Sequence, residues 1–445
     1  MRINKDEIRK TLTLAYPVII GQLGFIMMGV VDSVMVGSVG AVPLAAASVG
    51  NSLFILIFIV GLGISIAVTP LVAIAVGGNR YEECGILFRQ SLLINLVVGI
   101  LIALIIFILS QLLNHINQPP EVVSLAGSYS KLLGFSAIPG MIFSSYKQFI
   151  EGFSVMKPAM FVVLLANLIN AFFNWLLIFG KMGFPELGLD GAGWATFASR
   201  IFMAVVIMMY VMRAANFKQY DVTFHFKSIN ARIIKKILAL GLPSGMQYFF
   251  EVGAFSFAVV MVGWLGTYQL AAHQIAINLA SISFMCAVGV SAAGSIRVGN
   301  AVGRRNIPET RRAGFTAVVV SASIMGTFGI VFITLRNFLP SLYIDNPAVI
   351  SFASSILIIA ALFQVSDGVQ AVGIGILRGL TDVKAPTVIT FIAYWVLALP
   401  IGYLLGFTFK YGIVGVWIGL FLGLTTSALL LTLRFNKKSK HFVSI

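Results

Sequence analysis

Three acidic residues lie inside long apolar stretches of this 445-residue chain, where a charge is out of place. Asp32, Glu251 and Asp367 are each the lone acid in a stretch that could cross a membrane. A charged side chain at the centre of a membrane helix costs about 2.5–3.5 kcal/mol on insertion scales, so such residues usually serve a function. We predict that these three residues are cation sites or proton carriers.

The chemistry of such a group follows from its surroundings. Removal from water favours the protonated form of a carboxyl group, which can then take up a proton on one side of a membrane and release it on the other. When it is ionised, the same group attracts an inorganic or organic cation. Internal pairing is the alternative, but Arg200 is the single base expected inside a span, and one base cannot neutralise three acids.

Polar residues follow a helical spacing in one segment. Asn167, Asn170 and Asn174 are spaced by three and four residues, which places them on one face of a helix. Thr196 in the next segment could reach the same region. These side chains either line a site beside Asp32 or join helices by hydrogen bonds.

Two prolines lie inside segments that are expected to be helical. Pro17 and Pro243 each remove a backbone hydrogen bond and allow the helix to bend. We treat both as candidate hinges, with static bends as the alternative.

The composition shows what must position these residues. Hydrophobic residues make up 59% of the chain and charged residues 10%, and the mean hydropathy is +0.99. Soluble domains contain about a quarter charged residues, so this chain needs lipid around it. With two cysteines and four histidines it is not expected to hold a disulfide framework or a zinc site.

A membrane-crossing helix needs about 20 mostly apolar residues. Two stretches are long enough for two spans each, and one weaker segment, 122–146, is interrupted by Lys131. The sequence therefore predicts an all-α integral membrane protein with twelve transmembrane helices, drawn from the stretches 11–79, 90–120, 122–146, 158–180, 191–212, 237–296, 313–335, 346–377, 385–409 and 411–433.

The basic residues agree with that count. If the N-terminus is cytoplasmic, nearly all lysines and arginines fall in inside loops and tails, as the positive-inside rule expects. The outside segments contain four basic residues: Lys131, Lys181, Arg336 and Lys410. The net charge of +15 then reflects topology, with both termini cytoplasmic, and does not call for a nucleic-acid partner.

The two halves of the chain repeat each other, because adding 226 to a residue number in the first half gives its counterpart in the second. Pro17 aligns with Pro243, and the identical tetrapeptides at 34–37 and 260–263 fall at the same offset. Six spans in each half enter the membrane from the same face, which predicts two six-helix bundles related by a pseudo-twofold axis along the membrane normal. We expect an N-lobe at 1–213, a cytoplasmic linker at 214–232 and a C-lobe at 233–445.

Motifs for other chemistry are missing. The sequence contains no phosphate-binding G-x-x-x-x-G-K-[ST] loop and no H-E-x-x-H pair, and no nucleophile with a nearby base is evident. We therefore expect no enzyme activity and no cofactor. Energy for transport would come from an ion gradient.

Several short segments together resemble one family, the MATE transporters, which extrude multidrug and toxic compounds. The acid set of Asp32, Glu251 and Asp367 is most similar to the NorM-type branch. The resemblance covers the whole chain, and beside the paired tetrapeptides it rests on Ala271-Ala272-His273-Gln274-Ile275, Arg297-Val298-Gly299-Asn300 before Gly303, and Leu377-Arg378-Gly379 before Pro386.

The resemblance implies two six-helix bundles in a V shape that export amphiphilic, mostly cationic compounds in exchange for Na⁺ or H⁺. It implies an N-lobe cation or substrate site at Asp32 with Asn170 and Asn174, to which Thr196 could add. Bending at Pro17 would accompany switching of this lobe.

For the C-lobe, the resemblance implies a cation site formed by Glu251 and Asp367, with Na⁺ as one candidate. Some NorM-type members have a tyrosine one turn before the second acid, where this chain has Phe363. The missing hydroxyl weakens the case for Na⁺ and leaves proton coupling open. Some archaeal relatives carry an acid at the position of Asn174, so a proton switch in the N-lobe is not carried over intact.

Three other functions remain as alternatives. A flippase for lipids or lipid-linked oligosaccharides, from the same superfamily, would be expected to have a more cationic cavity. A channel would favour polar stripes along every pore-lining helix, and an intramembrane enzyme would need a catalytic constellation. We expect a monomer in a bacterial-type inner membrane, with small organic cations and membrane lipid as its partners.

Overall fold

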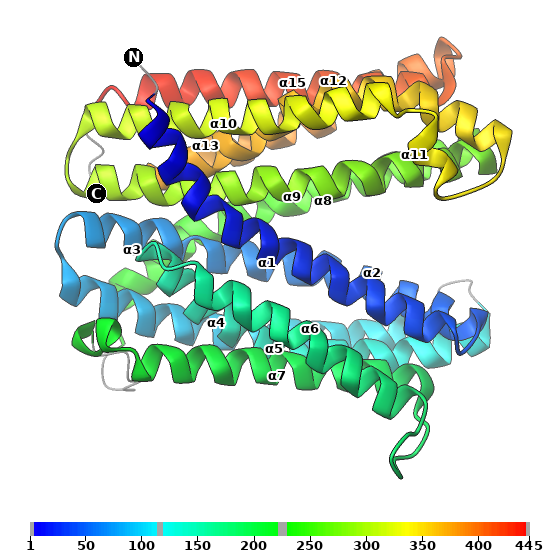
Figure 1. Ribbon diagram of the computed structural model, residues 1–445, viewed down its shortest axis with the longest axis horizontal. Coiled ribbons are helices and arrows are strands. Elements are labelled where there is room, and N and C mark those ends of the chain that lie inside the picture. The colour runs from blue at the N-terminus through cyan, green and yellow to red at the C-terminus, as the bar shows by residue number, and fades with distance from the viewer. Residues whose placement is uncertain (1–3, 114–118, 221–228, 442–445) are drawn as a thin grey trace. The chain divides into compact units, whose positions relative to one another are not determined.

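The computed structural model describes residues 4–113, 119–220 and 229–441, and these residues are almost entirely helical, with no β-strand among them (Figure 1). In the first half of the chain the helices are α1 (Lys5–Gly37), α2 (Ala41–Ile66), α3 (Val68–Gly77), α4 (Tyr81–Leu112), α5 (Pro120–Gly152), α6 (Lys157–Ile178), α7 (Gly188–Arg213) and the 3₁₀ turn η2 (Ala215–Tyr220). In the second half they are α8 (Ala231–Leu265), α9 (Thr267–Gly303), α10 (Ile307–Thr334), α11 (Phe338–Ser341), α12 (Pro347–Gly379), α13 (Lys384–Phe391), the π-helical η4 (Ile392–Ala398), α14 (Leu399–Tyr403), the π-helical η5 (Leu404–Thr408) and α15 (Gly412–Lys438).

Within the described residues these helices make twelve long segments. α2 and α3 are interrupted only at Ala67, and the helices from α13 to η5 follow one another without a gap. Eleven of the segments are long and apolar enough to cross a membrane by length and composition. The predicted helical membrane fold is confirmed.

The twelfth segment is α5, which contains the weak candidate 122–146. Most of its side chains are buried, and Ser136, Ser144 and Ser145 are hydrogen-bonded to side chains of other helices. A helix that faces protein on most sides can carry polar residues, because neighbouring helices supply the hydrogen bonds that lipid cannot. Protein contacts thus allow α5 to carry polar residues.

The helices pack into two compact units. Unit 1 contains residues 1–19, 77–79 and 246–445, and unit 2 contains residues 20–76 and 80–245. α1 therefore passes from unit 1 to unit 2 after Ile19, and α8 passes from unit 2 to unit 1 after Gly245. Each change of unit falls two residues after the proline inside that helix.

The lobes expected at 1–213 and 233–445 stay a prediction based on the repeat. The compact units differ from them in the first turns of α1, in the first turns of α8 and in residues 77–79, each of which packs with the opposite half of the sequence. Of the predicted linker at 214–232, residues 221–228 lie outside the described residues.

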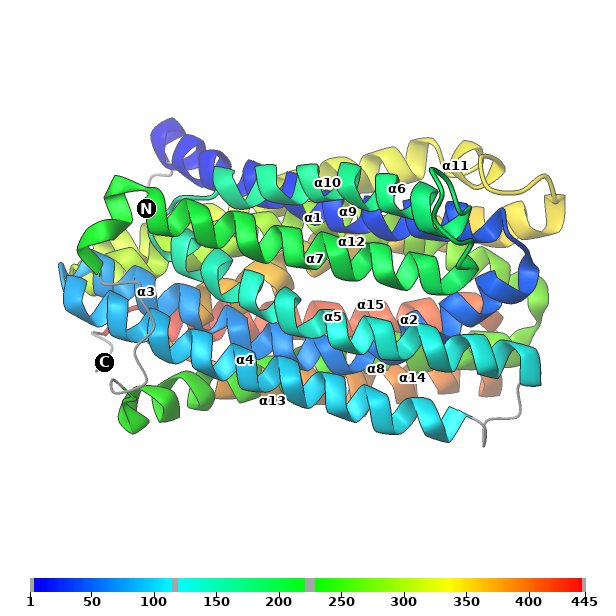
Figure 2. The same cartoon turned by 90° about the horizontal axis from the view of Figure 1, so that it is seen from below.

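Unit 2 is built around α5. This helix packs against α2, α4 and α7, and α6 packs against α7; Figure 2 shows α5 running between α4 and α7. Aromatic side chains fill part of the core, with the ring of Phe88 4.9 Å from that of Tyr146 and 4.7 Å from that of Phe149.

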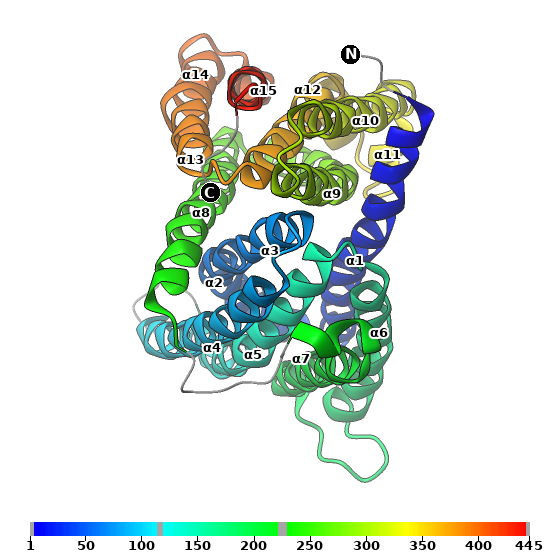
Figure 3. The same ribbon diagram turned by 90° about the vertical axis from the view of Figure 1, so that its left-hand side faces the viewer.

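Unit 1 is built around α12. It packs against α9, α10 and α15, and Figure 3, which looks along the helices, shows α9, α10 and α12 as one bundle. Trp417 on α15 and Phe363 on α12 are buried in this core with their rings 5.5 Å apart.

The 226-residue repeat extends to the helix boundaries. Adding 226 to α2–α3, residues 41–77, gives 267–303, which is α9. The same shift takes α5 at 120–152 to 346–378, one residue from α12. α5 and α12, the central helices of the two units, therefore occupy equivalent positions in the repeat.

Candidate cation and substrate sites

The first predicted site comes together in unit 2 from three helices. Asp32 on α1 is buried, with 8% of its surface exposed. Nδ2 of Asn174 on α6 donates a hydrogen bond to Oδ1 of Asp32 at 2.5 Å, and the hydroxyl of Thr196 on α7 donates to Oδ2 at 3.3 Å. Two neutral donors thus orient the carboxyl group of Asp32 without placing a positive charge on it.

The two asparagines of this site lie one helical turn apart, as their spacing predicts. Nδ2 of Asn174 also donates to Oδ1 of Asn170 at 3.1 Å, and both residues are fully buried. Within the described residues, Oδ1 of Asn174 accepts no hydrogen bond. Hard cations prefer oxygen ligands, so this free oxygen beside a carboxylate is suited to a small cation.

Asn167 belongs to the same spacing but not to the site. Its side chain is only partly buried, and its Nδ2 donates to the carbonyl of Val163 on its own helix at 2.9 Å. Helical spacing alone had placed it with the other two asparagines.

Arg200, which had no partner in the sequence analysis, lies in the interior of unit 2. Nη1 donates to the hydroxyl of Ser136 at 2.7 Å, and the guanidinium lies 4.5 Å from the ring centre of Phe54 and 5.2 Å from that of Phe58. It lies within electrostatic range of Asp32, but in the described part of the chain no hydrogen bond or ion pair joins the two residues. Asp32 is therefore not neutralised by a direct ion pair with Arg200.

The second predicted site lies in unit 1, where Glu251 on α8 and Asp367 on α12 are both buried. The two carboxyl groups are within electrostatic range of each other. Nε2 of Gln370 on α12 donates to Oε1 of Glu251 at 3.3 Å. Two acids that repel each other in a place shielded from water favour a proton or a cation between them.

Two residues of this second site were missed in the sequence analysis. Gln370 lies one turn beyond Asp367, a spacing that could have pointed to it. Tyr394, in the π-helical segment η4, donates its hydroxyl hydrogen to Oε1 of Gln370 at 2.9 Å and is fully buried. Tyr394 has no such signal, because nothing in its segment places it near α12.

Phe363 lies where the resemblance had raised the question of a hydroxyl ligand. Its side chain is 2% exposed and packs on Trp417. Among the described residues, no group of three or more His, Cys, Asp or Glu side chains is placed to hold a metal ion. A cation at the acidic pair would need its remaining ligands from neutral oxygens or water.

Comparison with known proteins identifies the chain. The sequence profile of the MatE family matches residues 17–176 and again residues 243–404, which agrees with the internal repeat. The probable multidrug resistance protein NorM of Mesorhizobium japonicum is 37% identical over 443 residues, covering 98% of this chain and 95% of that protein. The multidrug resistance protein MdtK of Yersinia pseudotuberculosis is 36% identical over 448 residues, with coverage of 98% and 96%.

Solved structures agree at the level of the fold. The eukaryotic MATE transporter AtDTX14 superposes with a TM-score of 0.88 at 22% identity, covering 98% of both chains. An outward-facing multidrug resistance MATE transporter of the MOP superfamily superposes with a TM-score of 0.89 at 20% identity, covering 99% of this chain and 100% of that one. From the repeated profile match and the full-length relatives, this chain belongs to the MatE family.

Proposed function

We propose that this protein is a multidrug efflux antiporter that exports amphiphilic, mostly cationic organic compounds in exchange for Na⁺ or H⁺. The names of its NorM and MdtK relatives, both multidrug resistance proteins, support export of drugs. The protein acts as a transporter and not as an enzyme, and it needs no cofactor beyond the coupling ion.

One observation carries this proposal. Asp32, Glu251 and Asp367 are buried, and none of them forms an ion pair with a basic residue among the described residues. Arg200 lies within electrostatic range of Asp32, and Arg378 within electrostatic range of Glu251, but neither arginine forms a direct ion pair with the acid in the described part of the chain. Burial of the charged carboxylates is therefore still costly, and binding of a proton or cation lowers that cost. Exchange of one positive species for another at these groups is the chemistry of an antiporter.

The two sites differ in what surrounds the acid. In unit 2 the rings of Phe54 and Phe58 are stacked with their centres 4.8 Å apart, and the guanidinium of Arg200 lies over both rings. Arg200 in turn lies within electrostatic range of Asp32. The direct hydrogen-bond donors to Asp32 are the neutral side chains of Asn174 and Thr196, and a carboxyl group in such surroundings can attract an organic cation. We assign the substrate and a cation site to unit 2, at Asp32, Asn170, Asn174 and Thr196.

In unit 1 a chain of neutral polar groups leads to the acids. Gln370 bonds to Glu251, and Tyr394 bonds to Gln370. We assign the coupling ion to Glu251 and Asp367, which hold a proton or, with neutral oxygens and water, Na⁺. Pro17 and Pro243, close to the residues where α1 and α8 change unit, are the proposed hinges.

The test of this assignment is efflux of a cationic fluorescent dye from energised cells. Asp367→Asn and Glu251→Gln are each expected to abolish efflux at normal membrane expression. Asp345→Asn is the matched control, because Asp345 is an exposed acid in the same unit. Wild-type efflux from either site variant would contradict the assignment.

The identity of the coupling ion can be tested by measuring export from proteoliposomes loaded with substrate. An imposed Na⁺ gradient and an imposed pH gradient are applied separately, and the one that drives export identifies the ion. Transport under neither gradient would contradict the antiporter proposal.

We further propose that the protein acts as a monomer in the bacterial inner membrane, surrounded by lipid, with both termini in the cytoplasm and no nucleic-acid partner. A reporter enzyme that is active only in the cytoplasm, fused to the C-terminus, is expected to be active. Activity of a periplasmic reporter at the same position would contradict this orientation.

A further inference from the structure

The π-helical segment η4 directs two consecutive side chains to two different helices. The hydroxyl of Tyr394 donates to Oε1 of Gln370 on α12 at 2.9 Å, and Nε1 of Trp395 donates to the backbone oxygen of Phe250 on α8 at 3.0 Å. Both bonds lead to Glu251, because Gln370 donates to its carboxyl group and Phe250 precedes it in the chain. The side chain of Glu251 is therefore held through Gln370 and its backbone through Phe250, in both cases from η4.

The indole of Trp395 also packs closely on α8. A Cβ atom added to Gly253 would be 3.2 Å from Cζ2 of Trp395, so the missing side chain at this glycine lets the ring come this close. The ring centre of Trp395 is 6.3 Å from that of Phe257, one turn further along α8. Trp395 is thus fixed by a hydrogen bond just before Glu251 and by ring contacts just after it.

The hydrogen bond of Trp395 gives this contact a direction. An indole nitrogen can only donate, and in apolar surroundings it needs an acceptor. The ring is half-buried, and the backbone oxygen of Phe250 is that acceptor. Because a fixed donor meets a fixed backbone oxygen, the bond sets the position of α8 relative to η4. Loss of the bond would leave Glu251 free to shift relative to Asp367 on α12.

The segment that carries Trp395 is unusual in its backbone. Within the described residues, π-helix occurs in η4 and η5, and both belong to the one span Lys384–Thr408. π-helical turns are rare and are found frequently at functional sites. Proteins depart from regular local structure mainly where function requires it. The backbone of η4 therefore points to a role beyond crossing the membrane.

Unit 2 provides an internal comparison. The 226-residue repeat relates η4 to residues 166–172, which lie in the uninterrupted α-helix α6. It relates Tyr394 to Leu168 and Trp395 to Ile169, whose side chains cannot donate hydrogen bonds, and it relates Glu251 to Phe25. The π-helix, its two donors and the acid therefore occur together in unit 1, and the equivalent positions of unit 2 have none of the three.

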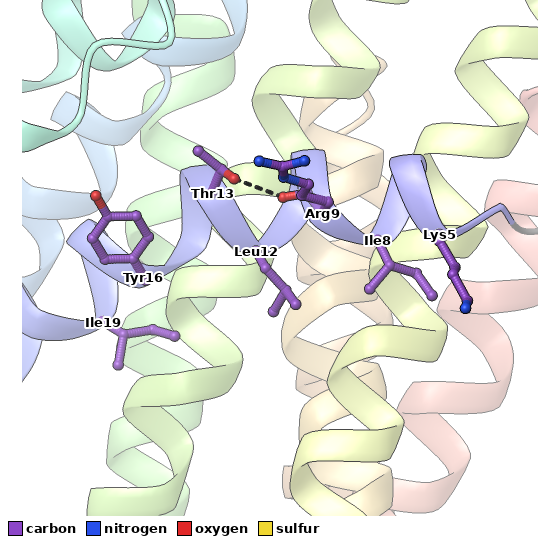
Figure 4. A pocket seen from close by; sticks show the side chains of 7 residues that line it. All are labelled: Lys5, Ile8, Arg9, Leu12, Thr13, Tyr16 and Ile19. Carbon is purple, nitrogen blue, oxygen red and sulfur yellow. Dashed lines mark hydrogen bonds between the residues drawn. The ribbon is translucent and has the colours of Figure 1, made fainter.

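A hollow of about 410 Å³ on unit 1 lies at a different place. Its lining residues all belong to α1, among them Ile8, Leu12 and Tyr16 (Figure 4). Because α8, α12 and η4 do not line it, this hollow is not where an ion would meet Glu251. An ion at Glu251 would depend on groups that the packing of those three segments positions.

We propose that Trp395 is a positioning residue for the coupling ion. Its contacts with α8 on both sides of Glu251 hold this acid toward Asp367, and that orientation sets the affinity of the site for the ion. The inference rests on the proposed antiport, in which the two acids bind the ion. Trp395 itself acts through α8 and touches neither ion nor substrate.

The first test measures export from substrate-loaded proteoliposomes at increasing external concentrations of the coupling ion. Trp395→Phe keeps an aromatic ring and removes the N–H group. We expect the concentration for half-maximal export to rise about fivefold, as for the loss of one hydrogen bond. The maximal rate per folded molecule should change by less than about twofold, because saturating ion still fills the site. Trp395→His, which keeps a ring N–H donor, should shift the half-saturating concentration less.

Trp264→Phe is the matched control, because Trp264 is an exposed tryptophan of the same unit. It should leave the half-saturating concentration unchanged. A purely structural role of Trp395 would lower the yield or the maximal rate and leave the half-saturating concentration at its wild-type value. That result, or an equal shift in Trp264→Phe, would overturn the inference.

A second pair of variants tests the ring contact without touching the indole. Gly253→Ala pushes the ring of Trp395 away from α8 and should raise the half-saturating concentration in the same direction. Gly263→Ala, on the same helix, is the control, because no atom lies within 4 Å of its added methyl group. Combining Gly253→Ala with Trp395→Phe should give less than the sum of the two effects, since both act through one contact. Fully additive effects would contradict the inference.

Failure of the proposed function gives a different result. In that case wild-type protein would export substrate under neither a Na⁺ gradient nor a pH gradient. Export by the wild-type protein, with unchanged half-saturating concentrations in Trp395→Phe and Gly253→Ala, would overturn the role of Trp395 alone.

Discussion

The side chain of Asn174 donates a hydrogen bond to the carboxylate of Asp32 at 2.5 Å, joining α6 to α1 inside unit 2. The two residues are 142 positions apart in the sequence. Because the donor is neutral, the bond orients the carboxyl group of Asp32 without adding a positive charge beside it.

Asn174→Leu is expected to weaken binding of a cationic substrate about tenfold, since a hydrogen bond to a charged group contributes about 1.5–3 kcal/mol. Substrate affinity of the purified protein, measured by fluorescence polarisation, tests this. Asn167→Leu is the control, because Asn167 donates to the carbonyl of Val163 on its own helix and forms no hydrogen bond with Asp32 among the described residues. An equal loss in both variants would argue against a specific role for Asn174.

Tyr394→Phe removes the hydroxyl that bonds to Gln370, which in turn bonds to Glu251. We expect efflux per folded molecule to fall severalfold, because Gln370 is no longer held toward the acid. Tyr403→Phe, at an exposed ring on the same segment, should leave efflux unchanged. Dye efflux normalised to membrane expression is the measurement, and an unaltered Tyr394→Phe rate would remove Tyr394 from the site.

Trp417→Phe is a prediction about stability and not about transport. Nε1 of Trp417 donates to Nδ1 of His273 at 3.1 Å, and both residues are fully buried. Without the donor a buried nitrogen is unsatisfied, which costs about 1–3 kcal/mol. Thermal unfolding in detergent should show the loss, whereas Trp264→Phe at an exposed position should not.

Gly63→Ala should destabilise the fold through the crossing of α2 and α8. The added methyl group would lie 2.3 Å from Cα of Gly245, so backbone must move, and overpacking of this kind costs about 1–3 kcal/mol or more. Gly29→Ala is the control, because no atom lies within 4 Å of its added methyl group. Removal of a helical glycine there should be neutral or stabilising by up to about 1 kcal/mol. Yields of monodisperse protein and its thermal unfolding distinguish the two outcomes.

Much of the architecture was predictable because a membrane limits what a chain can do. Apolar stretches long enough to cross the bilayer must be helices, since lipid cannot satisfy backbone groups. The stretch 158–180 became α6, and the weak segment 122–146 became α5. The spacing of Asn170 and Asn174 also predicted a shared face correctly, because one helix fixes that geometry by itself.

The partners of those faces were not predictable from periodicity. Asn167 satisfies the same spacing but bonds within its own helix, and Tyr394 reaches Gln370 from a π-helical segment that no pattern had marked. Helical periodicity predicts which residues share one face of a helix, but it does not predict which other helix that face contacts.

By itself the sequence determined a duplicated, lipid-embedded helical chain with three acids away from water. Span length, the scarcity of charged residues and the internal repeat all follow from the linear order of the residues. Only the tertiary structure decided that α1 and α8 each divide between the two units and that Arg297 meets Glu7 where Leu71 and Ile237 pack in the other half. The reason is that side chains hundreds of residues apart meet through the packing of whole helices, which depends on crossing points such as Gly63 and Gly289 that a linear pattern does not encode.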